Sequence, residues 1–486
     1  MSLKKCAIAL GVALLSASCT VGPDYKKPPA TVPAAFKERP SPESTLAAEW
    51  RVAQPNDDAM RAKWWEVFED PLLNSLVEQV AISNQTVAQA EAQFRAARAA
   101  IRGARADWFP TVTAGASATR SHASSTRGSE PVATGTINDF QLPIDFSYEV
   151  DLWGRVRRNV ESSVASAQAT RADVQTALLS SQAELALDYF QLRGLDTQIA
   201  LLQSTLTAFE RALQLTRARH DQGVASGVDV AQAQTQLDTT QVQATDLQIA
   251  RAQFEHAIAI LIGKAPADLT IAAAVIEASP PAVPLTLPSQ LVERRPDVAA
   301  AERRVVAANA QIGVAQAAFF PTLALTAGGG LQSSMLNTLL TLPSRFWAIG
   351  PSLAETVFDG GRRRSIKAQA VAAYDGTVAA YRQSTLTAFQ DVEDNLAALR
   401  VLADEAVQAR AAVASANHSL ELANNRYVGG VTTYLEVITA QTAALANEIT
   451  AASVSTRRMT ASVLLIKALG GGWTTADLPV AGALRR

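Results

Sequence analysis

The sequence predicts an α+β membrane protein in which a few strands lead into very long helices. The first observation is a set of strands whose residues alternate between apolar and polar, which suits a sheet with one face in lipid. The second is a pair of helical stretches far longer than a compact core can contain. The third is an internal duplication, which indicates that both halves share one plan.

The duplication is visible as a constant offset within the 486 residues. Gly223 recurs as Gly430, a separation of 430 − 223 = 207 positions, and the same shift takes Asp229 onto Glu436. Because one offset holds over a long stretch, the chain contains a duplicated unit with no insertion between these landmarks.

Two repeats and several simpler segments follow from this offset. Each repeat is expected to contain an opening helix, a strand pair, a long helix and a shorter returning helix. The expected segments are a lipoprotein signal peptide (1–18), an acylated, extended N-terminal tether (19–63), the first repeat (64–263), a linker (264–288), the second repeat (289–470) and a C-terminal tail (471–486).

The strand pairs have the clearest local pattern. Within 140–153, Phe146 and Tyr148 fall on an apolar face, while Asp145 and Glu149 fall on a polar one. The predicted strands are 109–120 and 140–153 in the first repeat, and 320–331 and 346–358 in the second.

A long helix is predicted after each strand pair. The stretch 157–222 contains no proline and would measure roughly 90 Å as one helix. The stretch 362–427 has the same length and a similar composition. The returning helices are expected at 228–263 and 433–469. Helices of this length favour packing side by side, as in coiled coils.

The N-terminus indicates export. A basic start, an apolar segment and small residues precede Cys19, which is the pattern of a bacterial lipoprotein signal. We expect a diacylglycerol and an N-acyl chain on Cys19 and no other cofactor. The alternative is an ordinary secretory signal that contains this cysteine by chance. Cys6 and Cys19 are the two cysteines, so a disulfide framework is excluded.

Composition and motifs exclude several function classes. The net charge is −2, which does not favour nucleic acid as a partner. After the signal, no run reaches the roughly eighteen apolar residues of a spanning helix, so a membrane crossing would need strands. Four histidines lack a metal-ligand spacing, and no nucleophile or phosphate-loop motif is present. We therefore expect neither an enzyme nor a metal site.

Four strands cannot close a barrel alone, because the hydrocarbon core does not tolerate free sheet edges. Two copies would supply eight strands and a barrel filled by side chains, whereas three would supply twelve and leave a lumen. Asp145, Glu149 and Asp151 on the polar faces favour the wet interior.

The candidate functional residues lie where the long helices turn, far from the strands. One turn contains Gly223, Gly227 and Asp229. The other contains Tyr427, Gly430, Leu435 and Glu436. A ring of Leu435 or Glu436 from several copies could constrict a pore, and Asp229 could line the same aperture. The alternative is that Asp229 and Glu436 only favour the first turn of a helix through its dipole.

Several motifs together resemble the outer-membrane factors of tripartite efflux systems, the TolC-like channels, and specifically the NodT/OprM-type lipoprotein branch. The resemblance covers essentially the whole mature chain. The motifs are Cys19-Thr20-Val21-Gly22-Pro23-Asp24-Tyr25, Trp64-Trp65 to Asp70-Pro71, Arg295-Pro296-Asp297-Val298, Phe320-Pro321, Phe358-Asp359-Gly360-Gly361 and the turn from Tyr427 to Gln441.

The resemblance implies a homotrimer with a twelve-stranded barrel in the outer membrane, continuous with a helical barrel in the periplasm. It implies docking to a periplasmic adaptor and an inner-membrane efflux pump, usually of the RND class, with a passive duct that exports small molecules. The protein would be lipid-anchored in the outer membrane. The competing hypothesis is a structural lipoprotein that spaces two membranes without a pore, but such a spacer has no use for strands with an apolar face.

The family's periplasmic gate transfers to this sequence only in part. Leu435 matches its apolar constriction and Glu436 one acidic position, whereas a second acidic position is Thr439 here. Some relatives have a latch of Tyr, Arg and Asp. The resemblance assigns Tyr427 and Asp229 to that latch.

The third member of the latch is missing, because the Arg position is Thr432 in this chain. We therefore expect a weaker or differently built latch.

Overall fold

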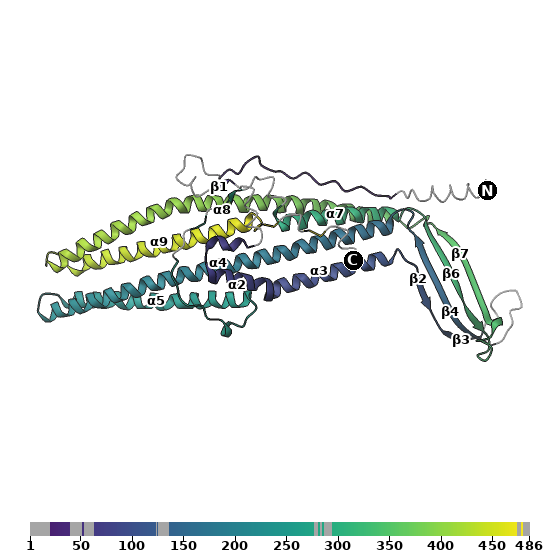
Figure 1. Cartoon of the computed structure of the whole chain (residues 1–486), viewed down its shortest axis with the longest axis horizontal. Coiled ribbons are helices and arrows are strands. Elements are labelled where there is room, and N and C mark those ends of the chain that lie inside the picture. Colours follow the sequence, from purple (N-terminus) through teal and green to yellow (C-terminus); the bar gives the residue numbers. More distant parts are fainter. Residues whose placement is uncertain are drawn as a thin grey trace.

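The computed structural model shows an elongated body of helices with a curved sheet bent away at one end (Figure 1). The signal peptide, Cys19 and parts of the expected tether, linker and tail lie outside the described residues. The structure describes residues 20–38, 51–52, 63–122, 124, 136–276, 280–281, 284–285, 294–473 and 478–479.

The first half forms short helices, then strands, then two long helices. The expected opening helical region is divided at Asp70 and Asn84, whose side chains accept hydrogen bonds from the first backbone N–H groups of the helices that follow them. In chain order the elements are the 3-10 helix η3 (Trp64–Phe68), α2 (Pro71–Ser83), α3 (Gln85–Ala106), β2 (Thr111–Ala114), β3 (Ser117–His122), β4 (Thr136–Val150), α4 (Arg155–Asp221) and α5 (Gly227–Leu261).

The second half repeats this order. In chain order the elements are the 3-10 helix η4 (Pro266–Asp268), β5 (Pro284–Leu285), α7 (Pro296–Ala317), β6 (Thr322–Ser333), the 3-10 helix η5 (Leu342–Ser344), β7 (Arg345–Ala354), α8 (Arg362–Val428) and α9 (Tyr434–Ala468). The short strand β5 pairs in parallel with β1 (Arg51–Val52). The apolar run 269–276 of the expected linker forms no strand.

Corresponding helices have equal lengths in the two halves. Both α4 and α8 contain 67 residues, both α5 and α9 contain 35, and both α3 and α7 contain 22. A helix of 67 residues is roughly 100 Å long. Among the described residues, no helix is both long and apolar enough to cross a bilayer.

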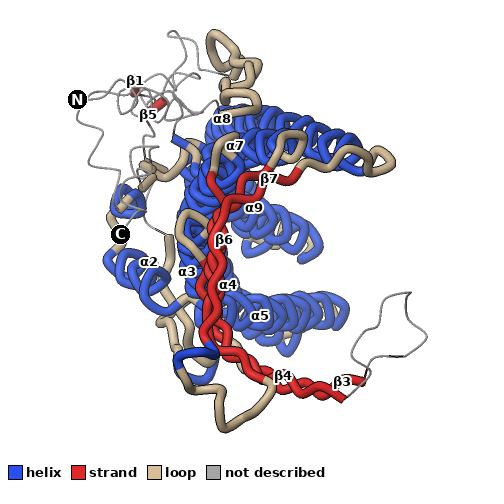
Figure 2. Tube along the Cα trace, turned by 90° about the vertical axis from the view of Figure 1, so that its right-hand side faces the viewer, coloured by secondary structure: helices blue, strands red, loops and turns tan. Residues whose placement is uncertain are grey.

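The sheet has the order β2-β4-β6-β7, with β3 also paired to β4 (Figure 2). The predicted strand 109–120 is therefore two segments, β2 and β3, separated at Gly115 and Ala116. The interruption lies beside Pro143 of β4, which has no backbone N–H to donate to a neighbouring strand. Instead, Gly115 N donates to Pro143 O at 3.0 Å.

The register of the paired strands places their apolar residues on one face of the sheet. One row across the sheet is Val112, Phe146, Ala327 and Ile349. The adjacent row, which faces the other side, is Thr111, Ser147, Thr326 and Gly350. The apolar face is exposed, since Ile349 is 75% accessible and Val112 is 62% accessible.

The last strand is shorter than expected. It was predicted to reach residue 358, yet β7 ends at Ala354. Glu355 interrupts the apolar alternation, and its carboxylate pairs with Arg363 at 3.1 Å. The chain leaves the sheet there because the carboxylate is held by the first turn of α8.

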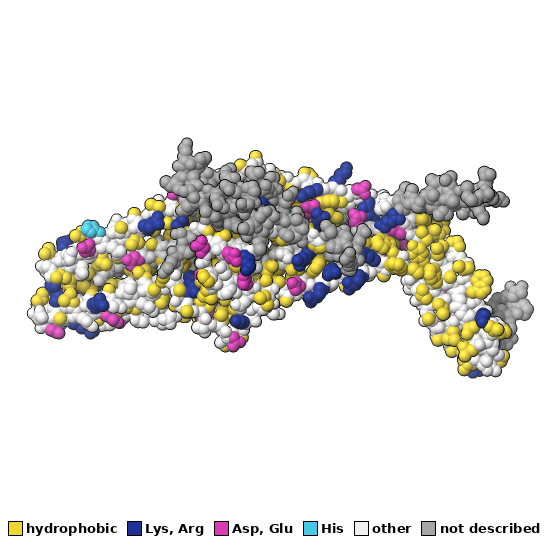
Figure 3. Space-filling model, in the orientation of Figure 1, with side chains coloured by type: hydrophobic (Ala, Val, Ile, Leu, Met, Phe, Trp, Pro, Cys, Tyr) yellow, Lys and Arg dark blue, Asp and Glu magenta, His cyan; other side chains and the backbone are white. Residues whose placement is uncertain are grey.

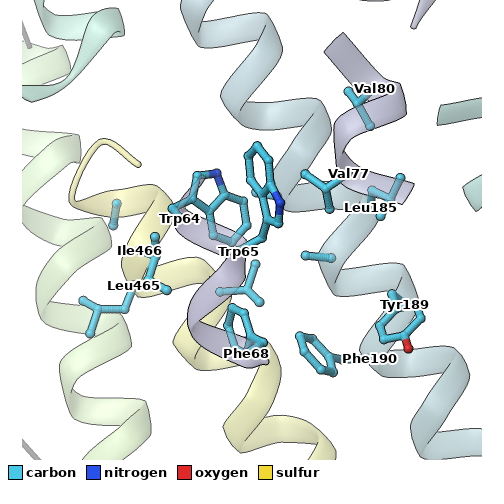
Figure 4. Close-up of a cluster of buried hydrophobic side chains, with 14 of the residues drawn as sticks. Trp64, Trp65, Phe68, Val77, Val80, Leu185, Tyr189, Phe190, Leu465 and Ile466 are labelled. Carbon is cyan, nitrogen blue, oxygen red and sulfur yellow. The ribbon is translucent and has the colours of Figure 1, made fainter. Parts of the chain in front are cut away.

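The main hydrophobic core lies between the two halves. Trp64, Trp65 and Phe68 of η3 are buried between α4 and α9 (Figure 4). The Phe68 ring packs on that of Phe190 in α4, with ring centroids 4.9 Å apart. Burying each such ring contributes about 2–3 kcal/mol, so η3 joins the two repeats.

The N-terminal segment 20–38 is extended, as expected, but it is bound along the helices and is not a free tether. Near the sheet, Val21 N donates to Trp153 O at 3.1 Å, and Asn309 Nδ2 donates to Pro23 O at 2.9 Å. Asp24 pairs with Arg158 at 3.0 Å. This end of the chain is therefore held beside the start of α4.

The same segment is held again further along the helical body. The backbone N–H groups of Lys37 and Glu38 donate to the carboxylate of Glu393 at 2.7 and 3.0 Å. Glu38 also pairs with Arg400 at 2.6 Å, and the Phe36 ring is buried. We call residues 20–38 the strap, because they connect the sheet end of α4 to the middle of α8.

We expect Gly313→Ala to release the strap at its sheet end. A methyl group at this position would lie 2.9 Å from Arg158 Cγ and 3.1 Å from Val21 O, so one of them must move. The overpacking should destabilise the strap by about 1–3 kcal/mol, even though Ala is the better helix former. Trypsin cleavage after Lys26 should accelerate.

The control is Gly227→Ala, whose new methyl would come no closer than 3.8 Å to His220. Equal cleavage rates in both variants would contradict the close packing of the strap on α7.

Candidate functional site

The two helical turns lie at the end of the body remote from the sheet (Figure 1). Gly223 and Gly430 have φ angles of 76° and 73°, in the left-handed region that glycine adopts without strain. Each glycine lets a long helix end and the chain reverse within a few residues. Of the predicted turn glycines, Gly223 and Gly430 lie in these two turns, and Gly227 is the first residue of α5.

The first turn is closed by a capping box. Ser226 Oγ accepts a hydrogen bond from Asp229 N at 3.2 Å, and Asp229 Oδ2 accepts from Ser226 N at 2.9 Å and from Ser226 Oγ at 3.0 Å. The Asp229 carboxylate therefore accepts a backbone hydrogen bond at the N-terminus of α5. This geometry favours the helix-start interpretation of Asp229 over a role in the pore.

The second turn has no such cap. Thr433 occupies the N-cap position of α9, but its side chain makes no capping hydrogen bond. Glu436 is held instead by Arg426 of α8, with Nη1 to Oε2 at 3.0 Å. Leu435 is 56% exposed at the tip. The second turn thus presents an ion pair and an apolar side chain, whereas the first uses its carboxylate internally.

A small aromatic cluster joins the two turns. The rings of Tyr427 and Tyr434 lie 5.2 Å apart, and both side chains are buried. They pack with Leu213 of α4 and Ala233 of α5, so all four long helices contribute to this tip cluster. Burial, together with the neighbouring Tyr427 hydroxyl, raises the pKa of Tyr434 to about 12. The Tyr434 hydroxyl therefore stays uncharged at neutral pH.

Arg219 connects the turns through a contact that the sequence patterns did not single out. Its guanidinium lies over the Tyr427 ring at 4.8 Å, and its Nη1 donates to Val428 O at 3.2 Å. It corresponds to Arg426 in the duplication, since 426 − 219 = 207. That correspondence is the signal that could have identified it.

The latch assigned to Tyr427 and Asp229 is built differently here. The Tyr427 hydroxyl is buried without a hydrogen-bond partner among the described residues, while Asp229 is bonded within its own turn. Thr439 donates to Leu435 O at 2.9 Å, so its side chain is directed to its own helix. Among the described residues, Arg219 is the one whose side chain forms a hydrogen bond from the first turn to the second.

No group of three or more metal-ligating side chains occurs in the described part of the chain. The tip presents an exposed apolar side chain, Leu435, and the Arg426–Glu436 ion pair at the ends of long helices.

Solved structures with this architecture are outer-membrane channel proteins. The outer-membrane channel OprN has a TM-score of 0.84 and 32% identity, covering 94% of this chain and 100% of its own. CusC has a TM-score of 0.83 and 26% identity, covering 93% and 100%. The fold is therefore that of an outer-membrane channel.

The chain belongs to the outer membrane efflux protein family, whose model matches residues 76–264 and 287–471. The toluene efflux pump outer membrane protein TtgF of Pseudomonas putida is 34% identical over 470 residues, 96% of each chain. Outer membrane protein OprJ of Pseudomonas aeruginosa is 34% identical over 478 residues, 96% of this chain and 95% of its own. This chain is an outer-membrane efflux channel protein, a transport conduit and not a periplasmic spacer.

We expect Arg219→Gln to loosen the connection between the two turns. The variant loses the cation–π contact and the bond to Val428 O, which together stabilise the joined state by about 1–2 kcal/mol. The ratio of separated to joined turns should rise about tenfold, and spin labels on the two turns should report a longer, broader distance distribution.

Arg217→Gln is the matched control, because Arg217 donates to Gln234 within the first hairpin at 2.7 Å. If both variants give the same distance distribution, Arg219 does not join the turns.

Proposed function

We propose that three copies of this chain form one twelve-stranded barrel continuous with a helical tunnel, and that this trimer is the exit duct of a tripartite efflux pump. The sheet is the main support for this proposal. Its edges at β2, β3 and β7 have no partner among the described residues, while its apolar face is exposed. A sheet in lipid cannot keep such edges.

We infer three copies because a duct needs a barrel with an open lumen. Each copy contributes four strand positions, so two copies would give a barrel filled by side chains and three an open one. The side opposite the apolar row contains Thr111, Ser147 and Thr326, which suit water. Four helical columns per copy would give a tunnel about 25–30 Å wide when twelve columns pack about 10 Å apart.

Two exposed helix faces support contact between copies. At the sheet end, α3 packs on α4, α4 on α7 and α7 on α8, so α3 and α8 are the outer members of the row. Gly103 lies inside α3 and Gly376 inside α8, and a methyl group at either would meet no atom within 4 Å. Glycine inside an exposed helix costs about 0.5–1 kcal/mol, and close approach of a neighbouring helix offsets that loss.

The lipid anchor supports placement of the barrel in the outer membrane. Cys19, which we propose to be acylated, is followed by Thr20, whose Cα would lie 3.3 Å from a methyl group at Gly154. The strap therefore begins where β4 ends and α4 starts, so a lipid on the preceding residue can enter the leaflet beside the barrel.

The tip is the proposed gate. Leu435 and Glu436 of each copy would form the aperture, while Arg219, Tyr427 and Tyr434 hold the two turns of each copy together. Asp229 contributes through its capping box and does not line the aperture. The helical end would dock a periplasmic adaptor and, through it, an inner-membrane pump of the RND class.

Conductance across a planar bilayer tests this gate. Leu435→Ala removes an exposed apolar side chain, and Glu436→Ala frees Arg426 from its ion pair, so each variant should raise single-channel conductance above that of the unmodified trimer. A large conductance that neither substitution changes would contradict gating at this turn, and no conductance in any preparation would contradict the duct itself.

Gly376→Leu should prevent trimer formation. A leucine in the exposed face of α8 separates it from α3 of the next copy, and overpacking of this kind costs about 1–3 kcal/mol per contact, three times per trimer. Native gels should show a loss of trimer. Circular dichroism should show unchanged helix content, because leucine favours the helix more than glycine. An intact trimer would show that α3 and α8 do not meet.

A further inference from the structure

The second sheet–helix junction has more positive charge than its acidic residues can balance. Its two carboxylates, Glu355 and Asp359, both pair with Arg363, at 3.1 and 2.8 Å. Arg362 and Arg364 are exposed, and Lys367 is half-buried. In the described part of the chain, the side chains of these three residues have no ion-pair or hydrogen-bond partner.

The first junction is balanced. Arg155 pairs with Glu149 at 2.8 Å, Arg157 with Asp151 at 3.7 Å, and Arg158 with Asp24 at 3.0 Å. At the offset of 207, Arg155 and Arg157 correspond to Arg362 and Arg364, so the duplication preserved these two arginines but supplied partners for them only at the first junction. The unbalanced positive charge is therefore specific to the second sheet–helix junction.

The unbalanced charge lies next to strongly apolar surface. Val357 and Phe358 are 92% and 88% exposed, and they precede Arg362 by only a few residues. Hydrophobic side chains gather over the sheet, and basic ones over the adjoining helices (Figure 3). An apolar band bordered by arginines matches the boundary between hydrocarbon and headgroups.

The other outer helix does not supply the missing negative charge. Near its sheet end, α3 exposes Arg102, while the exposed Arg95 lies nearer the middle of the helix, one turn after the exposed Glu91. The acid at its C-cap, Asp107, lies close to Arg155 of the same chain: the pKa of Arg155 is raised mainly by its hydrogen bonds to Glu149, and also by the charge of Asp107. In the proposed trimer, α3 of one copy and α8 of the next would thus bring two basic surfaces together.

We propose that an anionic phospholipid headgroup of the periplasmic leaflet binds at each seam between copies, where Arg362 and Arg364 of α8 face Arg102 of α3 in the next copy. This inference rests on the proposed trimer. The lipid phosphate offsets the repulsion between the two helices, and its acyl chains cover Val357 and Phe358. Three headgroups bind per trimer, and the site is specific for lipid because the apolar residues contribute to it.

The test is native mass spectrometry of trimers released from nanodiscs that contain phosphatidylglycerol and phosphatidylcholine. Wild-type trimers should retain phosphatidylglycerol in preference to phosphatidylcholine. In the double variant Arg362→Gln/Arg364→Gln, affinity for phosphatidylglycerol should fall about 25-fold, since each surface arginine contributes about fivefold. The control pair Arg211→Gln/Arg410→Gln removes the same charge from exposed positions nearer the tip and should retain the lipid.

Three outcomes would overturn the site without contradicting the wild-type trimer. They are equal lipid retention in the double variant, displacement of phosphatidylglycerol by inorganic phosphate alone, and dissociation of the double variant in pure phosphatidylcholine, which would show that the arginines bind the neighbouring copy. Failure of the wild-type protein to form trimers would instead contradict the proposed function, and the seam site with it.

Discussion

A sheet in a bilayer must pair every backbone edge, because water is not available to bond the free N–H and C=O groups. In this chain, the sheet ends at β2 and β3 on one side and at β7 on the other. The remaining architecture follows from that constraint. In the proposed trimer, other copies close the sheet, and they place the exposed glycines of α3 and α8, and the basic residues beside them, at seams between subunits.

The two ends of the helical body are held with different strength. At the middle and at the sheet end, η3 and the strap join the halves through buried rings and repeated hydrogen bonds. At the far tip, a small cluster and the Arg219 contacts connect the turns. In the proposed duct, which is sealed in the membrane and opens at its tip, this distribution would confine motion to the region with the fewest buried contacts.

The candidate site was only partly predictable, for a physical reason. The constant offset paired Asp229 with Glu436, yet Asp229 takes part in the capping box of α5 while Glu436 pairs with Arg426. Which partner a carboxylate takes depends on neighbours within a few ångströms, and the spacing of residues along the chain does not give those distances. Arg219 was missed because its contacts are with the other turn, about two hundred positions away in the sequence.

The sequence by itself determined the periodicities: which stretches are strands or helices, where they repeat, and that too few strands exist for one chain to close a barrel. Periodicity does not give the division of the first strand into β2 and β3. That division depends on the register, which places the break opposite Pro143, a residue with no backbone N–H to donate. Tertiary structure alone decided that the proline-rich N-terminus is a bound strap and that Arg219 lies over Tyr427. Both depend on side chains that meet across long separations, where packing and hydrogen bonding set the outcome and local preference does not.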